Sequence, residues 1–222
     1  MTREQQKKLK ELNKSLSSII KSNVKSYGIK KKDYMVWGIK NELYFSLLVD
    51  LRERDGHCYC CSEELVKPLW LDDLFWDIMD MPENKSEPLS LRCVGAFALH
   101  GMQVYEGEQE LMQWSVEELE QCVISDMEHF VNTMNHSDRE TYDSIFDVSA
   151  YQGELQEILC FIHNQDYQKA LERIQSMEDG GQFQNKGIWF REYAKKYCKK
   201  HISSGRSLRQ RFQEYAAKKC KK

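Results

Sequence analysis

Apolar residues recur at steps of three and four through residues 3–27, which predicts an amphipathic helix at the start of the chain. Gly28 follows it and suits the left-handed residue that often ends a helix. Two runs rich in aromatic and branched residues, 34–37 and 43–49, predict strands, and residues 38–42 between them suit a hairpin turn. Alternate positions of the second run are apolar, so one face of the predicted sheet is expected to cover a core.

The middle of the chain continues this mixture of strands and helices. The pattern predicts a short strand at 58–61, a helix over 68–80, and further strands at 89–99 and 102–105. Everything beyond Glu108 has a helical pattern. The sheet is therefore expected to be complete before the second half of the chain begins.

The second half opens with a strong helix signal. Ser115 and Glu118 have the spacing of a capping box, which predicts a helix that runs to about residue 135. Apolar positions in residues 154–177 predict a helical hairpin.

The predicted fold class is therefore α+β. It consists of an N-terminal helix, a small and mostly antiparallel sheet with a covering helix, and an all-helical C-terminal half. The two corresponding regions are residues 1–107 and 108–222, which can also form one continuous domain.

Charge is sorted along the chain. Residues 1–40 carry 11 Lys/Arg against 3 Asp/Glu, residues 41–185 carry 8 against 30, and residues 186–222 carry 13 against 2. The net charge of −3 thus hides two basic ends and an acidic middle. Such sorting can attract a charged partner, or the basic ends can pack on the acidic middle and neutralise it.

Eight cysteines occur without an apolar export signal, which predicts reduced thiols in a cytoplasmic protein. No run of residues approaches the ~18–20 apolar positions that a membrane-spanning helix needs. The 41% hydrophobic and 11% aromatic content predicts a folded chain with a sizeable core. The sequence leaves the oligomeric state open.

The segment His57–Cys61, with three cysteines, is the most metal-like in composition. Zinc sites commonly use two separated Cys/His pairs, and the obvious second pair is missing, because Cys93 and His100 lie seven residues apart. On a strand, alternate side chains point to opposite faces, so the three thiols cannot all face one ion. We therefore expect buried structural thiols, with no metal and no cofactor.

No recognised catalytic or phosphate-binding motif is present, including glycine-rich phosphate loops, GxSxG and HExxH. This absence weighs against an enzyme. An enzyme that uses a cysteine or a carboxylate outside such motifs is the third interpretation of the sequence.

The first functional hypothesis is a non-catalytic intracellular protein whose acidic middle binds another macromolecule, such as a basic protein. Carboxylates of the helix predicted over 68–80 would form the contact surface, with two tryptophans as apolar anchors. The predicted contact residues are Asp72, Asp73, Asp77, Asp80, Trp70 and Trp76. The four aspartates are expected to be mostly solvated.

The alternative hypothesis is a nucleic-acid-binding protein that uses basic C-terminal helices. Lysines and arginines interleaved with aromatic residues can follow a phosphate backbone while bases stack on the rings. The predicted contact residues are Arg191, Lys195, Lys199, Arg209 and Arg211. The aromatic residues fall on helical faces apart from most of this charge, which also suits packing against a core.

The segment 9–105 resembles a family of small bacterial α+β proteins known as a domain of unknown function. The resemblance lies in the opening helix, the run Tyr27-Gly28-Ile29-Lys30-Lys31-Lys32, and the hairpin at 34–49. The family typically has Gly-Phe-Lys-Lys in that run, so Ile29 replaces its aromatic residue. Some members are similar to immunity proteins of bacterial conflict systems. The resemblance implies an intracellular binder of a protein such as a nuclease-like toxin, and it transfers no functional residue.

Overall fold

The computed structural model divides into two compact units, Met1–Leu69 with Pro88–Ile145, and Trp70–Glu87 with Phe146–Lys222. The residues that the structure describes are 2–137, 153–177 and 183–203. The division differs from a boundary near residue 107, because the helix after residue 115 packs on the sheet of the first unit. None of the described helices is both long enough and apolar enough to cross a membrane.

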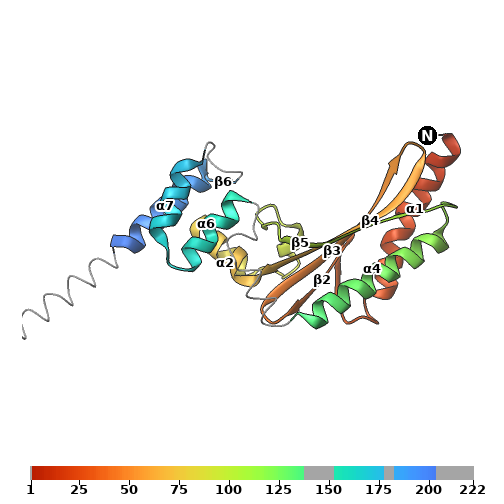
Figure 1. Ribbon diagram of the computed structural model, residues 1–222, viewed down its shortest axis with the longest axis horizontal. Coiled ribbons are helices and arrows are strands. Elements are labelled where there is room, and N and C mark those ends of the chain that lie inside the picture. Colours follow the sequence, from red (N-terminus) through yellow and green to blue (C-terminus); the bar gives the residue numbers. More distant parts are fainter. Residues whose placement is uncertain (1, 138–152, 178–182, 204–222) are drawn as a thin grey trace, which may run out of the picture. The chain divides into compact units, whose positions relative to one another are not determined.

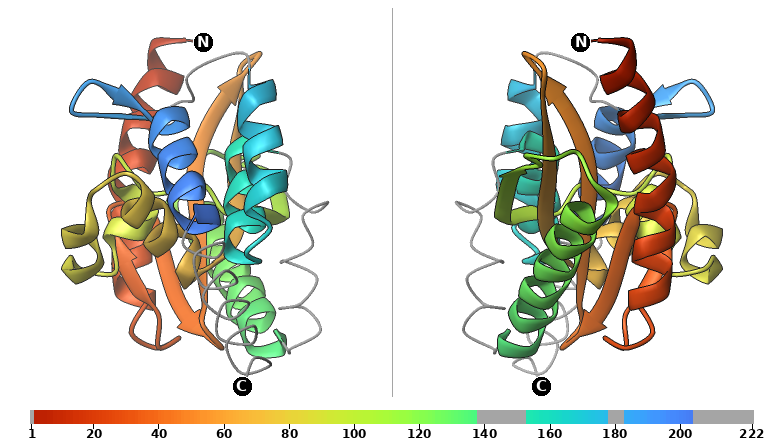
Figure 2. Two further views of the ribbon diagram at one scale, coloured as in Figure 1. Left: turned by 90° about the vertical axis from the view of Figure 1, so that its left-hand side faces the viewer. Right: turned by 90° about the vertical axis from the view of Figure 1, so that its right-hand side faces the viewer.

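A five-stranded antiparallel sheet forms the centre of the first unit, and each strand pairs with its neighbour in the sequence (Figure 1). The elements of this unit are α1 Arg3–Asn23, β1 Lys30–Lys32, β2 Met35–Lys40, β3 Leu43–Arg54, β4 His57–Pro68, α3 Leu91–Val94, β5 Met102–Glu110 and α4 Val116–His136. Helices α1 and α4 lie side by side on one face of the sheet, as the right-hand view of Figure 2 shows. The α+β prediction is confirmed.

The hairpin β3–β4 is the longest pairing in the sheet, with register from Leu43↔Pro68 to Arg54↔His57. Its two turn residues, Asp55 and Gly56, have φ of 54° and 84°. Positive φ at both positions is typical of the type I′ turn, whose twist matches that of the strands. The predicted strand at 58–61 is therefore only the first part of a twelve-residue strand.

The apolar face of β3 covers the core, as its alternation predicted. Leu43, Phe45, Leu47 and Val49 are all buried. The opposite face is also covered near Lys67, whose Nζ donates to the carbonyl oxygens of Arg92 and Leu99 at 2.7 and 2.5 Å.

The strand predicted at 89–99 is wrong. This segment contains the short helix α3 and irregular backbone, and two of its carbonyl groups accept hydrogen bonds from the Lys67 ammonium. Strand β5 pairs directly with β4, so no position beside β4 remains for another strand.

Helix α4 begins as the sequence predicted. The Ser115 hydroxyl accepts a hydrogen bond from the Glu118 backbone N–H at 3.2 Å, and the Glu118 carboxylate accepts one from the Ser115 N–H at 3.5 Å. The buried face of α4 holds mainly apolar residues, but it also includes Cys122 and Asp126.

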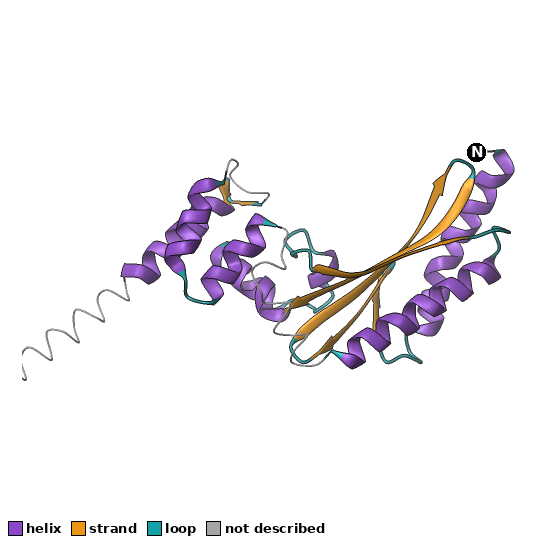
Figure 3. Cartoon of the chain, viewed as in Figure 1, coloured by secondary structure: helices purple, strands orange, loops and turns teal. Residues whose placement is uncertain are grey.

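The second unit is mostly helical (Figure 3). Its elements are α2 Leu69–Ile78, the 3-10 helix η1 Pro82–Ser86, α6 Glu154–His163, α7 Tyr167–Ser176, the two short strands β6 Gln184–Asn185 and β7 Ile188–Trp189, and helical residues 190–203. The helical hairpin predicted over 154–177 is confirmed. The prediction that everything beyond Glu108 is helical is wrong at the end of β5 and at the hairpin β6–β7.

Candidate functional site

The exposed side of α1 carries a row of basic side chains at steps of four, three, four and seven residues. This row, here the α1 ridge, consists of Arg3, Lys7, Lys10, Lys14 and Lys21, with Lys25 in the turn that follows the helix. All six are exposed. The buried residues of α1, from Leu12 to Ile20, lie on the other side of the helix. At 1.5 Å per residue the ridge extends over roughly 30 Å.

A cation from the sheet fills the one gap in the α1 ridge. Lys14 and Lys21 are seven residues apart, and Ser17 lies between them on nearly the same side of the helix. The Nζ of Lys31, on β1, lies 3.1 Å from the Ser17 hydroxyl oxygen. Two elements separated by a loop therefore contribute to one line of positive charge.

The basic side chains of the α1 ridge do not form ion pairs with carboxylates of the described chain. In the part of the chain that the structure describes, none of its six side chains pairs with a carboxylate. Like charges at i,i+3 and i,i+4, as in Lys7/Lys10 and Lys10/Lys14, destabilise a helix by about 0.2–0.5 kcal/mol each. Arg3 also lies in the first turn, where the helix dipole disfavours a cation. Lys21 lies in the last turn, where the dipole favours a cation, so helix stability accounts for only part of the α1 ridge.

The basic residues predicted in the second unit are only partly available. Arg191 is half-buried and donates through Nη1 to the Met177 carbonyl oxygen at 3.3 Å, so it holds two parts of this unit together. Lys195 is half-exposed and Lys199 is exposed. The aromatic residues of this helix pack inward, with Phe190 fully buried. Arg209 and Arg211 lie outside the described residues.

The acidic contact surface predicted on α2 is only partly exposed. Asp72 and Trp76 are buried, so the prediction that all four aspartates are solvated is wrong for Asp72. Asp72 occupies the first turn of α2, where the helix dipole favours a carboxylate.

Asp77 and Asp80 are exposed but already paired. The Asp77 carboxylate lies 2.6 Å from Lys85 Nζ, and the Asp80 carboxylate lies 3.0 Å from Lys186 Nζ. The second pair joins the basic end of the chain to its acidic middle within this unit. Such pairs reduce the field that these two aspartates present to a partner.

Trp70 and Asp73 are half-exposed, and Trp70 stacks on His163 with 3.8 Å between ring centroids. Burial lowers the pKa of His163. The unfolded chain takes up a proton near the ordinary histidine pKa of about 6.5, and the folded chain does so only at lower pH. The free energy that buried, neutral His163 contributes to folding is therefore fully present above about pH 6.5. It is lost as the pH falls below that value.

We expect acidification from about pH 7.5 to about pH 5.5 to destabilise the wild type more than the variant H163Q. Urea unfolding followed by tryptophan fluorescence at both pH values measures this difference. His136 is exposed, so H136Q is the control that should keep the wild-type pH dependence. Equal pH dependence in the wild type and H163Q would contradict the prediction.

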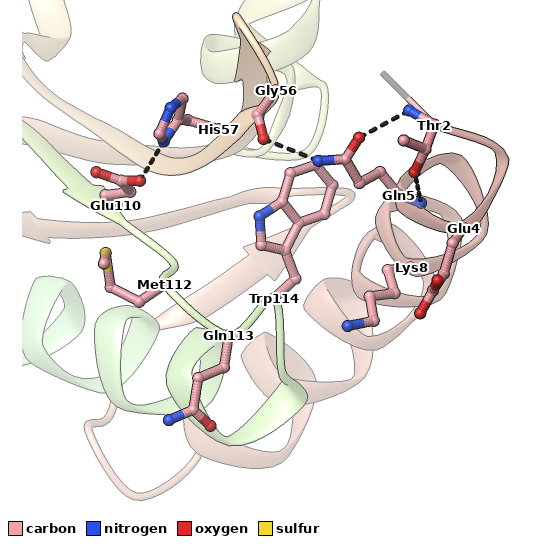
Figure 4. Close-up of a pocket in the computed structure, with 10 residues that line it drawn as sticks. All are labelled: Thr2, Glu4, Gln5, Lys8, Gly56, His57, Glu110, Met112, Gln113 and Trp114. Carbon is pink, nitrogen blue, oxygen red and sulfur yellow. Dashed lines mark hydrogen bonds and ion pairs between the residues drawn. The ribbon is translucent and has the colours of Figure 1, made fainter.

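A cavity of about 470 Å³ lies between the start of α1, the β3–β4 turn and the loop before α4 (Figure 4). Its lining includes Trp114 and a hydrogen bond between His57 Nδ1 and Glu110 Oε1 at 2.5 Å. The lining contains no thiol or serine, and the Thr2 hydroxyl is used as the N-cap of α1. The cavity can therefore hold a small polar molecule, but its lining does not form a nucleophile–base pair.

The three thiols predicted in one segment do face different sides of β4. The Cys61 thiol lies on the outer face, 3.7 Å from a Glu108 carboxylate oxygen. Cys58 and Cys60 lie on the inner face and are buried, and burial raises the pKa of Cys58 to about 11. A thiol with a raised pKa is a poor nucleophile, which agrees with the expectation of structural thiols at Cys58.

Cys60 faces side chains from α4 that sequence reasoning did not connect with it. The Cys60 and Cys122 sulfur atoms and an Asp126 carboxylate oxygen lie within 4.8 Å of one another, and all three residues are buried. The candidate partners considered from sequence, Cys93 and His100, are not part of this group. The Cys-x3-Asp spacing of Cys122 and Asp126 was the available signal, but a helix pair of this kind is common.

A buried acid lies beside this group. Glu64 lies four residues beyond Cys60 on the same face of β4, and its relative exposure is 1%. Its Oε1 lies 2.7 Å from Nδ1 of His129 on α4, and the His129 ring stacks on Tyr105 with 4.0 Å between centroids. Its Oε2 is buried and has no hydrogen-bond partner in the described residues.

Comparisons with known proteins add no functional residue to these sites. The sequence matches no family model, and neither the curated proteins nor the solved structures contain a match. Function is therefore inferred from the chemistry of this chain alone.

Proposed function

We propose that this protein binds the phosphate backbone of a nucleic acid through the α1 ridge. The observation that carries the proposal is the line of six exposed cations without carboxylate partners in the described chain, continued by Lys31 across its gap. Polyanions release counterions when lysines and arginines neutralise their charges, and this release drives sequence-independent binding. Like the first hypothesis from the sequence, this proposal describes a protein that binds a macromolecule. The binding surface is now the basic α1 ridge, whereas that hypothesis used the acidic residues of α2.

Duplex nucleic acid is the favoured ligand. Proteins that bind single strands combine basic grooves with aromatic rings on which bases stack. The α1 ridge consists of lysine and arginine side chains and contains no aromatic residue. Its chemistry therefore suits contacts to phosphates along a backbone, which position a protein without reading the sequence.

The test is fluorescence anisotropy of a labelled duplex of mixed sequence, titrated with the full chain over a range of salt concentrations. With six phosphate contacts we expect log K to fall with log salt at a slope of about −5, and affinity to fall about 10³-fold between ~50 and ~200 mM salt. A single strand of the same sequence should bind more weakly. Absence of binding to the duplex at about 50 mM salt would refute the proposal.

A basic protein captured by acidic residues is the second candidate function, retained from the sequence. Among the predicted contact residues, Asp77 and Asp80 are the exposed carboxylates, but each already has a lysine partner. The geometry therefore gives this candidate less support than the α1 ridge gives nucleic-acid binding.

A further inference from the structure

We propose that Cys60, Cys122 and Asp126 bind a zinc ion in the core of the first unit. This site is independent of the α1 ridge and uses none of its residues. Cys122 and Asp126 lie one turn apart on α4, and Cys60 faces them from β4. A strand and a helix that pack together thus hold three potential ligands in fixed positions.

The spacing of the three ligand atoms suits tetrahedral zinc. With Zn–S of about 2.3 Å and Zn–O of about 2.0 Å, tetrahedral ligands lie ~3.5–3.8 Å apart. The Cys122 sulfur and an Asp126 carboxylate oxygen lie 3.8 Å apart, and the Cys60 sulfur lies within 4.8 Å of both. Small side-chain adjustments would bring all three onto one ion.

Glu64 provides an independent observation that points to a cation. Its side chain is almost fully buried, and one of its two carboxylate oxygens has no hydrogen-bond partner in the described chain. An unpaired buried carboxylate oxygen is costly, and in native proteins it usually indicates a water or an ion. Glu64 is not one of the three clustered ligands, so it places a buried negative charge beside the site and the fourth position stays open to a water molecule.

Two thiolates with one carboxylate form a donor set that zinc accepts, whereas magnesium and calcium prefer oxygen donors alone. His129 Nδ1 lies 2.7 Å from Glu64 Oε1 and so fixes the position of this carboxylate beside the site.

The test is titration of the full chain, stripped of metal by a chelator and kept reduced by a phosphine, with Co²⁺ and then Zn²⁺. We expect one equivalent of Co²⁺ to produce a thiolate-to-metal charge-transfer band that Zn²⁺ removes. Zinc binding should release protons and raise the thermal unfolding temperature.

C122S and D126N should weaken zinc binding by more than about 100-fold, since even residues around metal ligands contribute 10–100-fold. E64Q should weaken it as well. C58S is the matched control, because Cys58 is buried on the same face of β4 but lies outside the group. Circular dichroism of each metal-free variant checks that it is folded.

Two results would overturn the proposal. One is a folded wild type that gives no charge-transfer band with Co²⁺. The other is a band that persists in C122S and disappears in C58S, which would place the metal elsewhere.

Discussion

Charge reversal of Lys7, Lys10 and Lys14 in one variant, K7E/K10E/K14E, is expected to abolish most duplex binding. Each phosphate contact contributes roughly a factor of 15 at ~50 mM salt, so the loss of three contacts should lower affinity roughly 10³-fold. The slope of log K against log salt should decrease in magnitude by about 3. Fluorescence anisotropy over a range of salt concentrations measures both quantities.

The variant should remain folded. All three side chains are exposed, so their replacement removes no buried contact. The triple change keeps like charges at the same spacings with the opposite sign, so repulsion along the helix stays of similar size. The thermal unfolding temperature of the variant should therefore lie close to that of the wild type. A loss of binding can then be assigned to the surface charge.

The matched control is K196E/K199E/K200E, which makes the same change in charge on exposed lysines of the second unit. It should retain most of the affinity. The opposite result, with binding lost in this control and kept in K7E/K10E/K14E, would move the nucleic-acid site to the basic C-terminal helices. Equal binding by both variants and the wild type would exclude both surfaces.

Truncation of Phe130 to alanine is expected to destabilise the first unit by about 3–5 kcal/mol. Phe130 is fully buried on the face of α4 that packs on α1 and the sheet. Alanine at this position loses the buried contacts of the aromatic ring. It also leaves a cavity between α4 and the sheet that the surrounding side chains can fill only partly. The ring therefore contributes both to the core and to the attachment of α4.

Hydrogen exchange resolved by peptide is the appropriate measurement, because unfolding of a two-unit chain need not be a single transition. Peptides from β3, β4 and α4 should lose protection in F130A. V116A is the control on the same helix, since Val116 is 39% exposed, and it should change protection little. Unchanged protection in F130A would show that α4 does not stabilise the sheet.

Local patterns in the sequence were sufficient to predict the elements that depend on local interactions. The steps of three and four in α1, the capping box of Ser115 and Glu118, and the alternation in β3 each follow from the geometry of a single element. The basic residues of α1 were also visible from the sequence. Their exposure and the position of Lys31 beside Ser17 depend on the packing of α1 against the sheet, which brings β1 next to the helix.

Tertiary structure decided the burial of polar residues and the sites formed by distant segments. Asp72 fits a solvated helix face by periodicity, yet it is buried, because burial depends on what packs against the helix. The apolar run at 89–99 predicts a strand, but β5 occupies the only free side of β4 and the Lys67 ammonium binds the carbonyl groups of the run.

The cluster of Cys60, Cys122 and Asp126 is the clearest example of a site that local sequence patterns cannot predict. Alternation along β4 placed Cys60 and Cys61 on opposite faces, and helical periodicity placed Cys122 and Asp126 together. No local signal related β4 to α4, because Cys122 lies 62 positions after Cys60 in the sequence. The sequence by itself determined the helices, the strand alternation and the charge sorting, whereas only the packing of α4 on β4 decided which thiols and carboxylates meet.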